Sequence, residues 1–133
     1  MAECRRGPSA PIRCSCVPSS PRDARELVRR VIAESGWQGD AEAAVLGTSE
    51  LVANALVHAG SLRRLELSLS GSCLRVEVED PSPATPAPRH PGLAATRGRG
   101  IAILERLATS WGYRCRGDGK LVWFELEGAS ARR

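Results

Sequence analysis

The chain has 133 residues, enough for one domain with an ordinary core and too few for two. Its hydrophobic content of 42% excludes a chain that is disordered throughout. The net charge of +4 arises within residues 1–30, which carry seven arginines, whereas the rest of the chain is neutral. Because nucleic-acid-binding domains carry basic charge on the folded body, the composition gives that function little support.

Export and membrane insertion are also disfavoured. No window approaches about 18 consecutive apolar residues, the length that predicts a transmembrane helix. The opening MAECRRGPSAP has no apolar centre for a signal peptide, so we expect a cytoplasmic protein. Five cysteines are an odd number, and without an export signal they predict reduced thiols rather than a disulfide framework.

The first predicted elements follow a disordered tail over residues 1–9, whose mixture of Arg, Gly, Pro and Ser has no apolar period. Residues 12–16 alternate between apolar and polar side chains and predict a short strand. Ser20 and Pro21 then open a helix as its N-cap and first helical residue, and Gly36 ends it.

A second helix is predicted from Asp40, a good N-cap, to Gly60. It is apolar nearly all round and belongs in the interior, so its few polar residues need an explanation. From Leu62 the period changes to two, and two strands follow around a turn at residues 70–72. Alternate residues of the second strand are apolar, and continuing this alternation places Asp80 on the apolar side.

The segment 81–97 contains five of the nine prolines and predicts a long loop, a feature that is more often functional than idle. A third helix follows, and its buried face is expected to comprise Ile101, Leu104, Leu107, Ala108 and Trp111. A final hairpin has strands predicted at 113–116 and 121–126 around a Gly-Asp-Gly turn.

This order of elements predicts an α/β (α+β) two-layer sandwich: a mixed, mostly antiparallel sheet with three helices on one face. We expect the domain to span residues 10–127 and a short C-terminal tail to follow over 128–133.

The best candidates for chemistry are Glu50, Asn54 and His58, which steps of four place on one face of the second helix. A carboxylate and an amide inside an apolar helix are costly unless a ligand such as Mg²⁺ with phosphate oxygens satisfies them. Asp80 could accept a hydrogen bond from an adenine amino group. The structural alternatives are side chains that cap neighbouring loops or turns.

A third candidate is Gly98-Arg99-Gly100 at the start of the third helix, where free N–H groups and the helix dipole favour phosphate. The flanking guanidinium groups of Arg97 and Arg99 suit phosphate as well. No phosphate-binding P-loop motif is present, and the cysteine spacing gives little support for zinc.

Taken in order, SELVANALVH at 49–58, Asp80, the long loop and RGRGIAIL at 97–104 resemble the Bergerat-fold (GHKL) ATPases. The closer likeness is to the anti-sigma-factor serine/threonine kinases of bacterial partner-switching systems. SPRDARELVRR at 20–30 and GKLVWFEL at 119–126 also look like that family, so the resemblance covers roughly residues 12–126.

The resemblance implies roles for these residues. Glu50 would be the base acting on a protein serine, or the group that orients it, and Asn54 would be the Mg²⁺ ligand. Asp80 would recognise the adenine of ATP, with residues 81–97 as the lid. The nucleotide site would further include Arg97, Gly98, Arg99, Gly100 and Ile101. His58 matches the family pattern, and a structural role is favoured for it.

Two departures from the family pattern stand out. The adenine-binding motif D-x-G-x-G reads Asp-Pro-Ser-Pro-Ala from Asp80, and proline cannot adopt the φ > 0 conformations that glycine permits. Near the C-terminus, Leu121 replaces a threonine whose hydroxyl helps to hold an adenine-linked water.

The implied function is an ATP-binding regulator that uses Mg-ATP to phosphorylate a serine or threonine on an anti-sigma-factor antagonist, while it sequesters a sigma factor or similar partner. No direct nucleic-acid or membrane partner is expected, and the family suggests a possible homodimer. One alternative is a catalytically weak or inactive protein-binding switch. A detached histidine-kinase catalytic domain is the least favoured, since no phosphoacceptor helix pair precedes residue 20.

Overall fold

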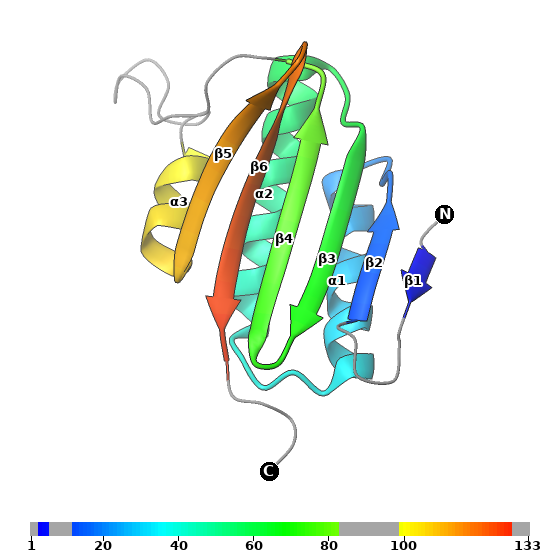
Figure 1. Cartoon of the computed structure of the whole chain (residues 1–133), viewed down its shortest axis with the longest axis vertical. Helices are drawn as coiled ribbons and strands as arrows, with labels where there is room; N and C mark the ends of the chain where they lie inside the picture. Colours follow the sequence, from blue (N-terminus) through cyan, green and yellow to red (C-terminus); the bar gives the residue numbers. More distant parts are fainter. Residues whose placement is uncertain (1–2, 6–11, 83–98, 129–133) are drawn as a thin grey trace.

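In the computed structural model, six strands pair in the order β1-β2-β3-β4-β6-β5, and each of the pairings described is antiparallel (Figure 1). The structure describes residues 3–5, 12–82 and 99–128. The strands are β1 (Glu3–Arg5), β2 (Ile12–Cys16), β3 (Arg64–Ser70), β4 (Cys73–Asp80), β5 (Ser110–Arg116) and β6 (Gly119–Glu127).

Three helices cover one face of this sheet, and its other face is open (Figure 1). They are α1 (Pro21–Ser35), α2 (Ala41–Ala59) and α3 (Arg99–Leu107). α2 lies between the other two helices and packs against both of them and against β4. The predicted two-layer α+β sandwich is therefore confirmed.

The helix ends follow the capping signals in the sequence. The Ser20 hydroxyl accepts a hydrogen bond from the Asp23 N–H at 3.1 Å, and the Asp40 carboxylate accepts one from the Ala43 N–H at 3.0 Å. Both helices end at glycines in the left-handed conformation, Gly36 with φ 78° and Gly60 with φ 81°. The predicted bounds of α1 and α2 are confirmed to the residue.

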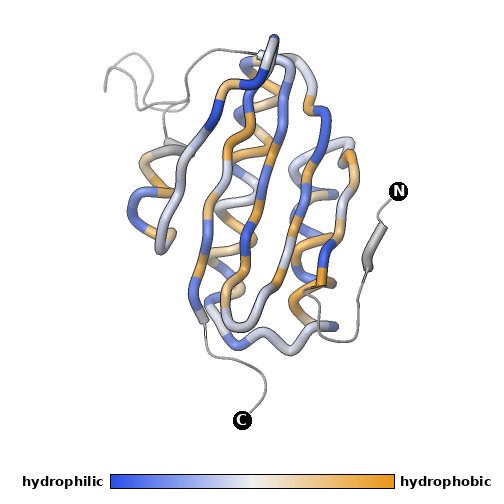
Figure 2. The backbone as a smooth tube through the Cα atoms, viewed as in Figure 1, coloured by the Kyte–Doolittle hydropathy of each residue, from blue (hydrophilic) through white to orange (hydrophobic). Residues whose placement is uncertain are grey.

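The core lies between the helices and the covered face of the sheet. Apolar and polar residues alternate along β3 and β4, which Figure 2 shows as alternating colours, and every second side chain is buried. Phe124 of β6, which is 1% exposed, packs under α2. The same parity buries Asp80 at the end of β4, as the sequence predicts.

Three local predictions differ from the structure. β1 lies inside the segment 1–9 predicted to be a disordered tail, because its backbone pairs with β2. α3 ends at Leu107, which is 36% exposed, and Trp111 belongs to β5 rather than to the helix. The helical period therefore stops earlier than predicted, since β5 begins at Ser110 and pairs with β6.

The cysteines also depart in part from the expectation of reduced thiols. Cys14 is disulfide-bonded, whereas Cys16 and Cys73 are free thiols. The pairing of β1 with β2 places Cys4 opposite Cys14 in the backbone register. The expectation of reduced thiols is therefore wrong for Cys14.

In the parts of the chain that the structure describes, no helix is both long enough and apolar enough to cross a membrane.

Candidate functional site

Two contacts, one with α1 and one with β6, show which way the sides of α2 face. Arg25 of α1 donates a hydrogen bond to the Ser49 hydroxyl at 3.0 Å, so that side of α2 faces α1. On another side, a Cβ at Gly47 would lie 2.8 Å from Cζ of Phe124 in β6. Asn54 is seven residues after Gly47, and helical geometry therefore places it on this second side, away from α1.

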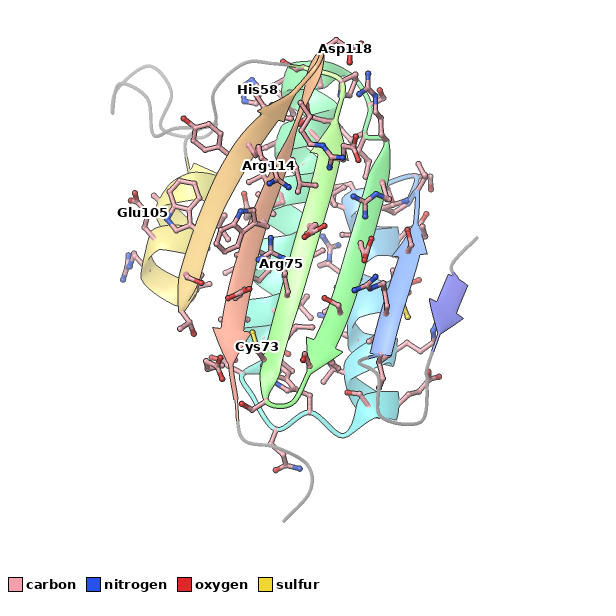
Figure 3. All side chains as sticks on the ribbon, viewed as in Figure 1. His58, Cys73, Arg75, Glu105, Arg114 and Asp118 are labelled. Atoms are coloured by element: carbon pink, nitrogen blue, oxygen red, sulfur yellow. The ribbon has the colours of Figure 1, made fainter. Side chains whose placement is uncertain are left out.

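Glu50 and Asn54 are half-buried on this face. Among the residues that the structure describes, neither side chain has a hydrogen bond or ion pair. His58 follows on the last turn of α2 and is exposed at that end of the helix (Figure 3). A half-buried carboxylate and amide with unused oxygens fit a ligand that brings a cation or a hydroxyl group.

Asp80 ends β4 at the same end of the sheet as the C-terminal end of α2 (Figure 1). Asp80 is 2% exposed, and its carboxylate has two hydrogen-bonding partners. The Ser82 N–H donates to Oδ1 at 2.8 Å. Nζ of Lys120 lies 3.0 Å from Oδ2 and 3.2 Å from Oδ1, so one ammonium contacts both oxygens.

Lys120 reaches Asp80 because the two residues are direct partners in the β4–β6 ladder. Opposite residues of an antiparallel pair project from the same face, here the helix-covered one. Lys120 is 5% exposed, and its Nζ also donates to the Ser82 carbonyl oxygen at 3.3 Å. The pair is therefore an ion pair inside the fold, satisfied by backbone groups of the turn after β4.

The backbone around this pair is tightly packed. A Cβ at Gly119 would lie 2.3 Å from the Asp80 carbonyl oxygen, so only glycine fits there. Next to it, Nη2 of Arg63 lies 2.9 Å from Oδ1 of Asp118, at the tip of the β5–β6 hairpin (Figure 3). The hydrogen bond from Arg63, and then its charge, lowers the pKa of Asp118. This exposed pair sits at the rim of the Asp80 end of the sheet.

The predicted phosphate-binding segment is described only in part. Arg99, Gly100 and Ile101 form the first turn of α3, so the predicted helix start is present. That start is directed toward the end of the sheet where β4 terminates (Figure 1). Arg97 and Gly98, and most of the predicted lid, lie outside the described residues.

The arrangement of α2, the end of β4 and the start of α3 can be compared with known proteins. Residues 17–126 match the family described as the histidine kinase-like ATPase domain. The chain belongs to this family. The match runs from before α1 to within β6 and includes each candidate residue from Glu50 to Ile101.

Other comparisons add little to the family assignment. Among solved structures, a histidine kinase, AdeS of Acinetobacter baumannii, is 15% identical with a TM-score of 0.49, over 85% of this chain and 66% of that one. The chain thus spans 66% of the length of that kinase structure. No curated protein matches the chain.

Membership of the histidine kinase-like ATPase family supports an ATP-binding regulatory function, and Asn54 fits a magnesium ligand. In the described part of the chain, no three His, Cys, Asp or Glu side chains gather into a metal site. Mg²⁺ is commonly held by one or two protein oxygens together with phosphate oxygens and water. The unused amide oxygen of Asn54 suits that arrangement.

Asp80 fits an adenine-binding role less well, because Ser82 and Lys120 already donate to its carboxylate. Leu121, which replaces a threonine of the family pattern, affects the Asp80 site less than the sequence suggests. It pairs with Glu79 and Arg114, so its side chain lies on the other face of β6 from Asp80. A hydroxyl at position 121 would not face Asp80 in this structure.

Sequence reasoning missed Lys120, although a signal for it exists. Val122, Phe124 and Leu126 mark the buried side of β6, and extending their parity backwards by two residues reaches Lys120. The glycine-rich turn was predicted to reach Gly119, so Lys120 was left outside the strand. The available clue was that Lys120 continues the alternating pattern of buried residues in β6.

Proposed function

We propose that this protein is an ATP-binding regulator of the anti-sigma-factor type. It binds Mg-ATP between α2, the end of β4 and the start of α3. It phosphorylates a serine or threonine on a small antagonist protein, and it holds a sigma factor or similar regulator as its second partner. The observation that carries the proposal is the pair of half-buried, unpartnered oxygen-bearing side chains on α2, Glu50 and Asn54, within a domain of the histidine kinase-like ATPase family.

Each group has a chemical task in this proposal. The Asn54 amide oxygen holds Mg²⁺, which neutralises phosphate charge when bound. Glu50, one turn earlier on the same face, orients the attacking hydroxyl and accepts its proton. The N–H groups of the first turn of α3, which includes Arg99, Gly100 and Ile101, favour the phosphates. Phosphate added to the antagonist blocks its docking through charge and bulk.

Calorimetric titration with ATP, with and without Mg²⁺, tests the binding half of this proposal. Wild type should bind ATP, and Mg²⁺ should strengthen binding. Asn54→Ala should lose the effect of Mg²⁺ and leave the metal-free affinity nearly unchanged. Glu42→Gln, an exposed change in the first turn of the same helix, is the matched control. If folded wild type does not bind millimolar ATP, the proposed function is wrong.

Transfer of labelled γ-phosphate from ATP to candidate antagonist proteins tests the catalytic half. Glu50→Gln should lower the transfer rate by about 100-fold or more, since a positioned base contributes about that factor. Its ATP affinity should stay close to wild type. Equal labelling by wild type and Glu50→Gln would exclude Glu50 as the base.

The Asp80–Lys120 pair favours a second candidate, a protein-binding switch with weak or no catalysis. A carboxylate engaged inside the fold is a poorer acceptor for adenine. Replacing Glu50 with alanine separates the two functions. A kinase loses its effect on the regulated promoter, whereas a switch that acts by contact alone keeps it.

Partner docking on α1 is the least constrained part of the proposal. Arg22 and Arg29 are exposed on α1, and Arg22 pairs with Glu26 at 3.6 Å, whereas Arg25 is half-buried and donates a hydrogen bond to Ser49 of α2. Two of these arginines thus have partners within the chain, which gives little support to a partner-docking surface built from these arginines. The sigma factor, the antagonist and a homodimer are proposed from family likeness.

A further inference from the structure

The Asp80 carboxylate has little hydrogen-bonding capacity left. An ionised carboxylate offers about four acceptor positions. The Ser82 N–H uses one on Oδ1, and Nζ of Lys120 lies within 3.2 Å of both oxygens. A ligand that donates to this group must therefore share it or displace a donor.

The lysine is a strong competitor for the carboxylate. A hydrogen bond from an ammonium group to a carboxylate is charge-assisted, whereas an adenine amino group is a neutral donor. The side chains of Lys120 and Asp80 are only 7% and 3% exposed, so water and salt screen their attraction weakly. The main chain fixes the contact as well, because the two residues are paired in the β4–β6 ladder and Gly119 packs on the Asp80 carbonyl.

We propose that Lys120 acts as an internal competitor for Asp80 and sets the affinity of the site for adenine nucleotides. The inference rests on the proposed ATP-binding function. Binding of the base moves Nζ of Lys120 off the carboxylate, and the adenine amino group takes its place. The Ser82 carbonyl, 3.3 Å from Nζ, is a second acceptor that can retain the ammonium at the edge of the site.

Replacement of Lys120 by methionine tests the competition. Lys120→Met keeps the length of the side chain and removes its charge, which leaves Asp80 with an unmet demand for a donor. ATP and ADP should then bind about tenfold tighter than to wild type, since removing a competing charged hydrogen bond changes affinity by at least that factor. Arg63→Met, which removes a positive charge from the same end of the sheet, is the control and should not tighten binding.

The wild-type chain offers a second test that does not depend on the folding of a variant. Lys120 is the only lysine in the sequence, so ¹⁵N-lysine labelling gives a single side-chain ammonium signal by NMR. Titration with ATP should shift this signal toward its position in free lysine side chains. ADP should do the same, because the competition concerns the base.

The outcomes separate this inference from the proposed function. If neither wild type nor Lys120→Met binds ATP while both are folded, the proposed function fails and the inference fails with it. If wild type binds ATP while the ammonium signal stays unchanged, or if Lys120→Met binds equally or more weakly, only the competition is overturned. A shifted signal together with tighter binding by Lys120→Met supports it.

Discussion

Glu79 and Asp80 are consecutive residues of β4 whose carboxylates lie on opposite faces of the sheet. Asp80 faces the helices and pairs with Lys120 at 3.0 Å, with both side chains at most 7% exposed. Glu79 faces the open side, where Arg64 lies 3.4 Å away and the two side chains are 29% and 22% exposed. One peptide bond therefore separates a buried ion pair from one that water reaches.

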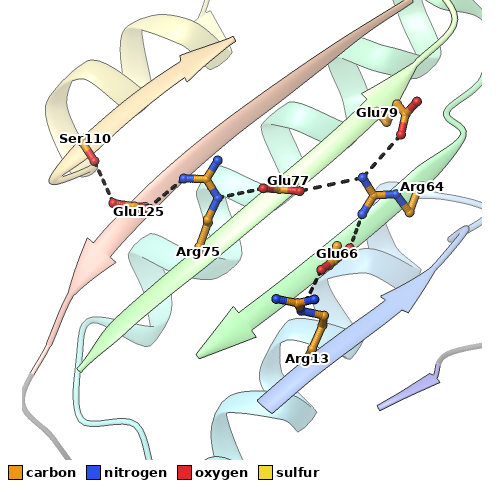
Figure 4. Close-up of polar contacts among 8 residues, drawn as sticks. All are labelled: Arg13, Arg64, Glu66, Arg75, Glu77, Glu79, Ser110 and Glu125. Carbon is orange, nitrogen blue, oxygen red and sulfur yellow. Dashed lines mark hydrogen bonds and ion pairs between the residues drawn. The ribbon is translucent and has the colours of Figure 1, made fainter. Parts of the chain in front are cut away.

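On the open face, the pairs form a continuous network across the strands (Figure 4). Glu66 is shared by Arg13 and Arg64, and Arg75 bridges Glu77 at 2.7 Å and Glu125 at 2.8 Å. Arg64 also pairs with Glu77 and Glu79, so it keeps other partners when one is lost, and the side chains of the network are all partly exposed. On the covered face, Asp80 and Lys120 form no other ion pair within 4 Å in the described chain, and Asp80 also interacts electrostatically with the charge of Arg63. We therefore expect an ion pair to contribute more to stability on the covered face, where water hardly reaches the two side chains.

The largest expected effect on stability is the difference between breaking the ion pair on the covered face and breaking one on the open face. Asp80→Asn should lower the free energy of unfolding by about 3 kcal/mol, because it leaves a buried ammonium without its counter-charge. Glu79→Gln should cost about 1 kcal/mol or less. Urea unfolding of both variants measures the difference. The double variant Asp80→Asn with Lys120→Met should recover most of the loss, and equal costs on the two faces would contradict the comparison.

The next effect concerns two glycines with similar contacts on opposite faces. A Cβ at Gly47 would lie 2.8 Å from the ring of Phe124, and one at Gly112 would lie 2.8 Å from the ring of Trp123. Phe124 is 1% exposed and confined under α2, whereas Trp123 is only half-buried on the open face beneath Arg75.

Thermal unfolding should therefore show a larger loss for Gly47→Ala than for Gly112→Ala. Overpacking a core costs about 1–3 kcal/mol, which exceeds the roughly 1 kcal/mol that alanine gains over glycine in a helix. Gly47→Ala combined with Phe124→Leu should regain part of the loss. A stabilising Gly47→Ala would mean that α2 shifts freely over the sheet.

A smaller effect of opposite sign is expected at Thr48. Its residue is fully buried on the covered face, and its hydroxyl oxygen has no hydrogen-bond partner in the described part of the chain. Thr48→Val has nearly the same shape and removes the unsatisfied group. It should raise the free energy of unfolding by about 1 kcal/mol, measured with urea. Thr48→Ser, which keeps the hydroxyl, is the control and should not stabilise.

The smallest effect lies on the open face at Cys73. Burial, followed by the charges of Glu125 and Glu127, raises the pKa of its thiol to about 11. In a Cys16→Ser, Cys115→Ser background, alkylation at pH 8 should be at least about tenfold slower than for an unhindered thiol. Glu127→Gln should speed it.

The raised pKa of Cys73 also determines how the stability of the fold changes with pH. Because the folded state holds the Cys73 proton more tightly than the unfolded chain, the associated stability is present below pH 9.0. It is lost as pH rises from 9.0 toward about 11. An alkylation rate unaffected by Glu127→Gln would mean that Glu127 does not contribute to the raised pKa of Cys73.

Much of the fold could be predicted because its signals are local. Caps at Ser20 and Asp40 and glycines at 36 and 60 fix the helix ends, and period-two alternation identifies β3 and β4. The three-residue strand β1 was missed because a segment so short has no period of its own. It exists through its pairing with β2, in which Cys4 lies opposite Cys14, so the strand depends on a partner outside its own three residues.

The candidate site shows the same limit. The spacing of Glu50 and Asn54 on one helix is local and could be predicted, and so could the burial of Asp80. The partner of Asp80 is 40 residues away in sequence and depends on the register between β4 and β6. Register is set by the packing of whole strands, so Lys120 emerged only when the two strands were placed side by side.

The order of the sheet also determines how this protein can meet copies of itself. The outer strands are β1, which is three residues long, and β5, which carries the exposed Arg114 and Arg116 toward its end. Short or positively charged outer strands are poor templates for strand addition by a second chain. Continuation of the sheet from one molecule to the next is therefore discouraged at both margins.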